Sequence, residues 1–216
     1  MRKAIAIACG VFLLGWIVSG QSTQPRSPIP TVTYTEGTVT IDGTDAQSGD
    51  SVPAGSLVVT GANSLVEIQF NTRNVIKLLE KTTLVFDPGN LSKGSELREG
   101  ALILILRKLL VGANGQALRV RTQNGTAGVR GTSFFMKVES PTSTYVCACN
   151  GDVQVLDNDD GPLKDLAASH HSALWIADEG GTPRLTEAPL LYHTDADMEK
   201  AAADIGFTID WNVVDR

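Results

Sequence analysis

The residues of this chain that are best suited to metal binding or redox chemistry are two cysteines and three histidines. Cys147 and Cys149 lie two positions apart in an alternating apolar segment, and His170, His171 and His193 follow them. Side chains two residues apart in a β-strand point to the same face, so both sulfur atoms are expected to face the same way. Two thiolates and two imidazoles make a tetrahedral ligand set suited to zinc, or to iron or copper by softness alone.

Three interpretations of the cysteine pair stay open. The sulfur atoms are metal ligands, with one of the adjacent histidines (His170 or His171) facing them and His193 completing the site. Alternatively, the two thiols form a strained, redox-active disulfide, which an oxidising compartment permits. In the third interpretation they are inert, buried thiols, with the two adjacent histidines in a polar loop and His193 capping a helix. The spacing differs from the usual ligand pairs of zinc fingers.

A second motif combines an arginine with glycines in Gly128-Val-Arg130-Gly131-Thr132. Glycine permits backbone angles and close approaches that a side chain would forbid. An arginine held there can donate hydrogen bonds to backbone carbonyls or to a carboxylate. We expect Arg130 to be a structural residue that ties turns together, because buried charges are paired. The alternative is a site for an anionic ligand.

Other patterns that would indicate catalysis are missing from the sequence. It contains no glycine-rich phosphate loop with a lysine, and three histidines are too few to argue for a Ser–His–Asp arrangement. The paired carboxylates Asp159 and Asp160 lie in an acidic loop, which is normally a solvated turn. We therefore expect a protein that is not an enzyme.

The N-terminus predicts an exported protein. A basic start precedes the uncharged apolar run Ala4–Val18, and small residues follow it at the positions that a signal peptidase reads. The run is shorter than the roughly 20 residues that span a bilayer, so no stable membrane span is expected after cleavage. Removing residues 1–20 takes away two basic residues and lowers the formal charge from −6 to −8. This acidic balance argues against nucleic acid as a partner.

The rest of the chain has the sequence pattern of an all-β protein. A Pro-rich tether over residues 21–30 precedes short alternating runs separated by Gly, Asn, Asp and Ser. We expect strands at 39–41, 56–60, 66–70, 75–79, 83–86 and 101–110, the last of them buried on both faces.

Beyond residue 157 the composition changes. An acidic loop over 157–161 is followed by a predicted last strand at 171–176 and by a helix at 195–205. Thr194 is the expected N-cap of this helix, acidic residues occupy its first turn, and Gly206 is its expected stop.

A weak internal repeat refines the fold class. Glu36-Gly-Thr-Val-Thr-Ile41, Glu99-Gly-Ala-Leu-Ile-Leu104 and Asn150-Gly-Asp-Val-Gln-Val155 each place a glycine before alternating aliphatic residues. This pattern fits a stacked-strand β-roll or an irregular β-helix-like domain, and equally fits ordinary turn chemistry in front of strands.

The chain resembles the FecR domain family. The resemblance runs from about Val32 to Leu156 and is most specific at Gly128–Phe134, where Gly-Val-Arg-Gly-Thr precedes a Phe. It implies an exported, β-rich module that recognises or scaffolds a protein or another envelope component. The iron-uptake regulators of this family carry an anti-sigma region and a membrane span before the domain, whereas here we expect only a signal peptide and ten further residues, and therefore no transmembrane regulation of transcription.

The sequence thus predicts four parts and a function. They are a signal peptide (1–20), the tether (21–30), a FecR-like β domain (31–157) and an extension with the last strand and a helix (158–216). We expect a non-catalytic periplasmic or extracellular module, with a metal site formed by the cysteines and histidines. The alternative is a periplasmic thiol redox protein or redox sensor that uses Cys147 and Cys149.

Overall fold

The computed structural model describes residues 29–70, 73–90, 92–107 and 118–215. The predicted signal peptide, most of the tether and the end of the strand expected at 101–110 lie outside these ranges. Within them, no helix is both long enough and apolar enough to cross a membrane.

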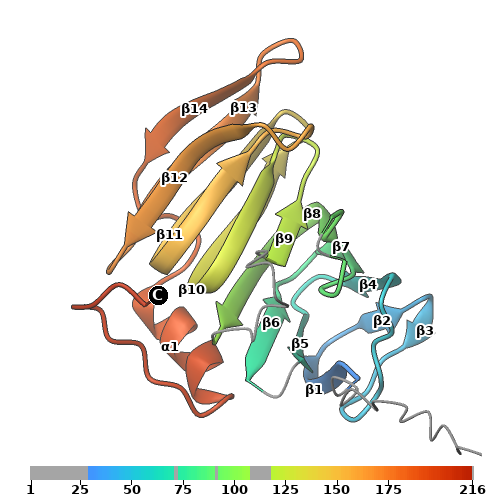
Figure 1. The fold of residues 1–216 in the computed structure, drawn as a ribbon. Coiled ribbons are helices and arrows are strands. Elements are labelled where there is room, and N and C mark those ends of the chain that lie inside the picture. The colour runs from blue at the N-terminus through green and yellow to red at the C-terminus, as the bar shows by residue number, and fades with distance from the viewer. Residues whose placement is uncertain (1–28, 71–72, 91, 108–117, 216) are drawn as a thin grey trace, which may run out of the picture.

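The described residues form an all-β fold with one short helix near the C-terminus (Figure 1), which confirms the predicted class. The strands are β1 (Thr31–Glu36), β2 (Val39–Ile41), β3 (Thr44–Asp45), β4 (Ser56–Thr60), β5 (Leu65–Phe70), β6 (Asn74–Leu78), β7 (Thr83–Phe86), β8 (Ser95–Leu106), β9 (Leu118–Arg121), β10 (Thr126–Ser140), β11 (Ser143–Leu156), β12 (Pro162–Ala168), β13 (Ser172–Asp178) and β14 (Pro183–Ala188), and the helix is α1 (Asp195–Ala203).

The strands belong to one branched sheet. Its longest path runs β14-β13-β11-β10-β9-β8-β7-β4-β2-β3, with β1, β5, β6 and β12 attached beside it. The pairing of β8 with β9 is parallel, and the other pairings between these strands are antiparallel. In Figure 1 the long strands β8 and β10 join a lower group, β1–β7, to an upper group, β11–β14.

The three glycines of the sequence repeat are points where a strand changes its partner. At Gly37 the chain passes from β1, paired with β5, to β2, paired with β4. At Gly100, β8 leaves β7 and begins to pair with β6, and at Gly151, β11 leaves β13 and begins to pair with β12. All three have a positive φ, of 72°, 83° and 122°, which glycine adopts without steric cost.

A serine or threonine hydroxyl lies opposite each of these glycines. A Cβ atom added at the three positions would come within 2.3–2.5 Å of the hydroxyl oxygens of Ser64, Thr82 and Thr132, respectively. Each hydroxyl accepts a hydrogen bond from the backbone N–H of the residue after its glycine, at 2.9–3.0 Å. The repeat in the sequence is therefore a repeated structural joint in which a side chain replaces a lost ladder hydrogen bond.

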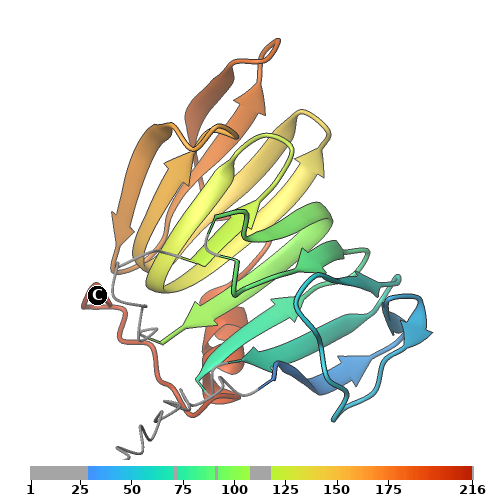
Figure 2. The same cartoon turned by 45° about the vertical axis from the view of Figure 1, so that its right-hand side comes forward.

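The central strands are buried on both faces, as predicted for the run that starts at residue 101. In β8, Leu102 and Leu104 face one apolar cluster, whereas Ile103 and Ile105 face a second one on the opposite side of the sheet. The second cluster is covered by α1 and the residues after it (Figure 2), with α1 in contact with β6 and β8. The sheet consequently separates two cores.

β12 and β14 are among the strands that were not predicted from the sequence. Both begin with a proline and bury few of their side chains, and β13, predicted as the last strand, is followed by β14. That prediction was wrong because each of the two strands pairs with a single neighbour, and such edge strands expose side chains that give no apolar alternation.

The helix was predicted correctly at its start. The Thr194 side chain accepts a hydrogen bond from the N–H of Asp197, whose carboxylate accepts one from the Thr194 N–H, which makes a capping box. The helix ends at Ala203, two residues before the predicted limit, and Gly206 follows with a φ of 67°.

Candidate metal centre

β11 places both cysteines on the face that the second core covers. Cys147 lies opposite Phe135 of β10 and Ala173 of β13, and Cys149 is the next residue on the same face. Neither cysteine is exposed, and they form no disulfide. Their sulfur atoms are 3.7 Å apart. The prediction that both sulfur atoms share a face is confirmed.

His171 reaches the sulfur atoms from the turn between β12 and β13. Its backbone N–H donates to the carbonyl of Cys149 at 3.0 Å, and its φ is 50°, in the left-handed region that non-glycine residues rarely adopt. This turn brings Nδ1 of the ring to 3.5 Å from Sγ of Cys147. The His171 side chain is 8% exposed to solvent.

His193 approaches from the opposite side, just before α1. It follows Tyr192, whose φ is 66°, and its ring stacks on Phe135 with 4.2 Å between ring centroids. Its Nε2 atom lies 3.2 Å from Sγ of Cys149, and its Nδ1 atom is 2.9 Å from the carbonyl oxygen of Leu191. The ring is therefore held between an aromatic side chain and a backbone carbonyl.

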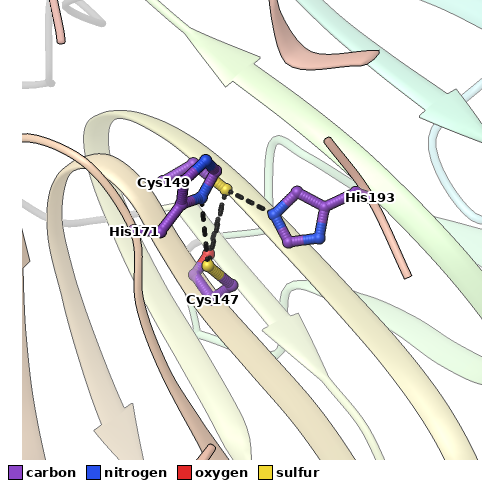
Figure 3. Close-up of side chains that lie close together, drawn as sticks. All are labelled: Cys147, Cys149, His171 and His193. Carbon is purple, nitrogen blue, oxygen red and sulfur yellow. Dashed lines mark hydrogen bonds between the residues drawn. The ribbon is translucent and has the colours of Figure 1, made fainter. Parts of the chain in front are cut away.

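The four side chains converge on one point (Figure 3), with their ligand atoms all within 4.8 Å of one another. In a tetrahedral zinc site, two sulfur atoms lie about 3.8 Å apart and a sulfur and a nitrogen about 3.5 Å apart, given the usual bond lengths. The three separations of 3.7, 3.5 and 3.2 Å are close to these values. Three of the six donor separations therefore match a tetrahedral zinc site, and the other three lie within 4.8 Å.

The outer nitrogen of each imidazole has a fixed acceptor. Nε2 of His171 is 2.7 Å from the carboxylate of Asp195, and Nδ1 of His193 faces the carbonyl of Leu191. A ring that donates its outer N–H in this way directs the lone pair of the other nitrogen toward the sulfur atoms. Metal-binding histidines in proteins almost always have such a partner.

Hydrogen bonding makes the two thiols unequal. A hydrogen bond from Cys149, together with hydrogen bonds to His171 and His193, lowers the pKa of Cys147 to about 4 against the opposing effect of burial. Burial raises the pKa of Cys149 well above its ordinary value. Burial alone would lower the pKa of His171, but its hydrogen bonds to Cys147 and Asp195 raise it. Cys147 is thus the more acidic of the two thiols.

His170 lies outside this cluster. Its ring is half exposed, with Nε2 3.0 Å from the carboxylate of Asp195 and the indole of Trp211 at 4.9 Å between centroids. Of the adjacent histidines that the sequence offered, the structure therefore places His171 at the sulfur atoms and His170 on the surface. Sequence reasoning assigned Asp195 only to the first turn of the helix, although its position two residues after His193 was a usable signal.

The family-model comparison matches residues 56–154 to FecR, described as FecR protein. This chain contains a FecR-family domain. The recognition made from the motifs is confirmed, and the FecR match includes Cys147 and Cys149 but ends before His171 and His193. The metal-binding candidates are therefore divided between the FecR domain and the segment that follows it.

Two other comparisons add little to the FecR assignment. No match was found among curated proteins. Two crystal structures of a candidate anti-sigma factor from Parabacteroides distasonis resemble the chain with a TM-score of 0.44 and 16% sequence identity. The match covers 61% of this chain and 59% of that protein, so the chain spans less than two thirds of its length.

The FecR motif Gly128–Thr132 contributes Thr132, the hydroxyl that faces Gly151 at the third joint of the sheet. Arg130 is exposed, so burial does not require its charge to be paired, and the premise for a buried arginine clamp was wrong. Thr132 makes the structural tie instead, since its hydroxyl accepts from the N–H of Asp152 and lies within 3.0 Å of the carbonyl oxygen of Arg130. Gly131 has a φ of 57° at this bulge, and Gly128 is buried within β10.

Proposed function

We propose that this protein is a non-catalytic module of the cell envelope that binds zinc through Cys147, Cys149, His171 and His193 and presents its FecR domain to a protein partner. The observation that carries the metal site is the convergence of four donor atoms within 4.8 Å of one another, two of them on imidazoles oriented by outer hydrogen bonds. The envelope location and the protein partner rest on the FecR-family domain.

The donor set favours zinc over other cations. Two thiolates neutralise the charge of a divalent ion, which matters in a site where both sulfur atoms are fully buried. Thiolate with imidazole in a tetrahedral arrangement is typical of zinc, and a site with four protein ligands and no open position is typical of a structural role. Iron and copper are tested in the same experiment.

Burial also supports a non-catalytic role. Cys147, His171 and Asp195 form a thiol–imidazole–carboxylate series, the arrangement that activates a cysteine nucleophile. A nucleophile must reach its substrate, whereas the Cys147 side chain has no exposed surface and points into a core. The series therefore suits a ligand and the groups that orient it.

One observation favours a second candidate, a thiol redox function. The two sulfur atoms are 3.7 Å apart, and Cys147 has a lowered pKa while that of Cys149 is raised. A thiolate next to a thiol is the starting point for disulfide formation when an oxidant is present. A disulfide between residues two apart in a strand would be strained, which makes it easily reduced.

Metal analysis of the purified protein tests the proposal. Protein prepared without chelator under reducing conditions is expected to contain one zinc per chain, and Cys147→Ser and His171→Ala to lose most of it. His170→Ala is the matched control, because it removes the neighbouring imidazole but leaves all four ligands.

The other outcomes select between the alternatives. Iron or copper in place of zinc would overturn the choice of metal. Protein without metal that loses both free thiols on oxidative equilibration would support the redox candidate. Protein without metal that keeps both thiols would leave them as inert core residues.

A further inference from the structure

The four proposed ligands come from three segments, and one of these segments forms a cover over the FecR domain. Cys147 and Cys149 lie in β11, His171 lies in the turn before β13, and His193 lies in residues 189–215, which we call the cap. Building on the proposed function, we propose that zinc clamps the cap onto the sheet, so that zinc binding and cap docking are thermodynamically coupled.

The surface under the cap is apolar. It consists of buried side chains from β6, β8, β10 and β11, namely Val75, Ile103, Ile105, Phe135 and Tyr145. The cap covers it with Met198, Ala201, Ala202 and Ile209, which are all buried, and with partly buried Phe207 and Trp211. Without the cap, this face of the sheet would be exposed to solvent.

Polar contacts add to this apolar contact: Asp195 of the cap pairs with His170 and His171, Lys200 lies 3.9 Å from Glu67, and the Arg107 guanidinium lies over the Phe207 ring. The Tyr145 hydroxyl donates to the carbonyl of Pro189 and accepts from the N–H of Leu191, at 3.0 and 3.1 Å. The Asn150 side chain donates to the carbonyls of Asp210 and Val213. The only helix of the cap has nine residues, and helices of fewer than about 12 residues are marginal in water unless they are packed against something.

Zinc would hold the cap near its start, through His193 and, indirectly, through Asp195 at the beginning of α1. When the cap leaves the sheet, His193 leaves with it, and so does Asp195, the carboxylate that orients His171. The open form then keeps three ligands, one of which has lost its orienting partner. Zinc therefore binds the closed form more tightly, and a cation that prefers one form stabilises that form by the ratio of its two affinities.

Hydrogen exchange of the full chain, with and without zinc, measures this coupling. Backbone amides of α1 are expected to exchange at least about tenfold more slowly in the zinc-loaded protein than after chelation. Amides of β4 and β7, which pair with each other far from the clamp, are expected to change little and serve as the internal reference.

Two variants separate the clamp from general stabilisation. His193→Ala keeps three ligands in the sheet and its turns but removes the one from the cap, so zinc is expected to slow α1 exchange much less in this variant, with only the coupling through Asp195 and His171 remaining. His170→Ala keeps all four ligands and is expected to retain the full zinc effect. If His193→Ala does not fold, the comparison of zinc-loaded and chelated unmodified protein still decides the question.

The failures of the two proposals are distinguishable. One zinc per chain with α1 exchange unaffected by chelation would overturn the clamp and leave the zinc site intact. Absence of bound zinc by metal analysis would overturn the proposed function, and the clamp with it. A zinc effect on α1 that keeps its full size in His193→Ala would also overturn the clamp, because the protection would then not depend on the ligand from the cap.

Discussion

At the scale of single residues, the candidate centre depends on which nitrogen of each imidazole faces the sulfur atoms and which one carries the proton. A histidine can present either nitrogen, and the acceptor on its outer side decides which one carries the proton. For His193 this acceptor is a backbone carbonyl, which no substitution of a side chain removes. For His171 it is the Asp195 carboxylate, whose own pKa is lowered by the hydrogen bond from His171.

Asp195→Asn tests this orientation. The amide keeps a similar shape but loses the charge that fixes the proton on Nε2 of His171, so zinc affinity is expected to fall about 10–100-fold. A competition titration with a chromogenic chelator measures this change. Asp165→Asn is the matched control, since it alters the same charge at an exposed position of β12 and should leave the affinity unchanged. Equal affinities for all three proteins would contradict the orienting role.

At the scale of elements, the fold depends on its glycine joints. Gly37, Gly100 and Gly151 each permit a strand to exchange one neighbour for another, and a facing hydroxyl closes the gap in the hydrogen-bond ladder. The joint at Gly151 follows the two cysteines directly and also contacts the cap, since a Cβ atom there would lie 2.9 Å from the carbonyl oxygen of Asp215.

Gly151→Ala is expected to be more destabilising than a substitution at an open glycine. Gly49 has a φ of 98°, and a Cβ atom added there would meet no atom within 4 Å, so Gly49→Ala should cost only about 1–2 kcal/mol for the unfavourable backbone. Gly151→Ala adds overlap with Thr132 and should cost roughly 1–3 kcal/mol more. Urea denaturation gives both free energies of unfolding. Losses of equal size would show that the joint tolerates a side chain.

At the scale of the whole molecule, the sheet has an apolar cluster on each face, and the two are covered differently. One cluster is enclosed by the strands of the sheet itself, whereas the other depends on the cap. Met198 is the largest of the three buried side chains of α1 and belongs to the cluster that depends on the cap. The stability of the cap should therefore respond to this one residue.

Met198→Asp is expected to release the cap. It places an uncompensated carboxylate in an apolar site, at a cost of at least about 3 kcal/mol, which should make the chain after residue 188 sensitive to protease while the strands stay resistant. Limited proteolysis followed by mass spectrometry detects this difference. Ala203→Asp adds the same charge to an exposed position of α1 and serves as the control. A cap that stays resistant in Met198→Asp would show that other contacts hold it.

The sequence by itself determined those features that depend on neighbours along the chain. Alternation of apolar residues in β8 predicted a strand buried on both faces, the capping pattern at Thr194 predicted the start of α1, and the spacing of Cys147 and Cys149 placed both sulfur atoms on one face. These features follow from the periodicity of strands and helices, which can be read directly from the spacing of residues along the sequence.

Only the tertiary structure decided what came to lie beside those residues. It selected His171 over His170 through the left-handed turn between β12 and β13, and it brought Asp195 to the outer nitrogen of that ring. It also exposed Arg130, which the motif had indicated as a buried clamp, and gave the structural role to Thr132. The physical reason is that these relations join residues 20 or more positions apart across paired strands, and sequence spacing carries no information about that pairing.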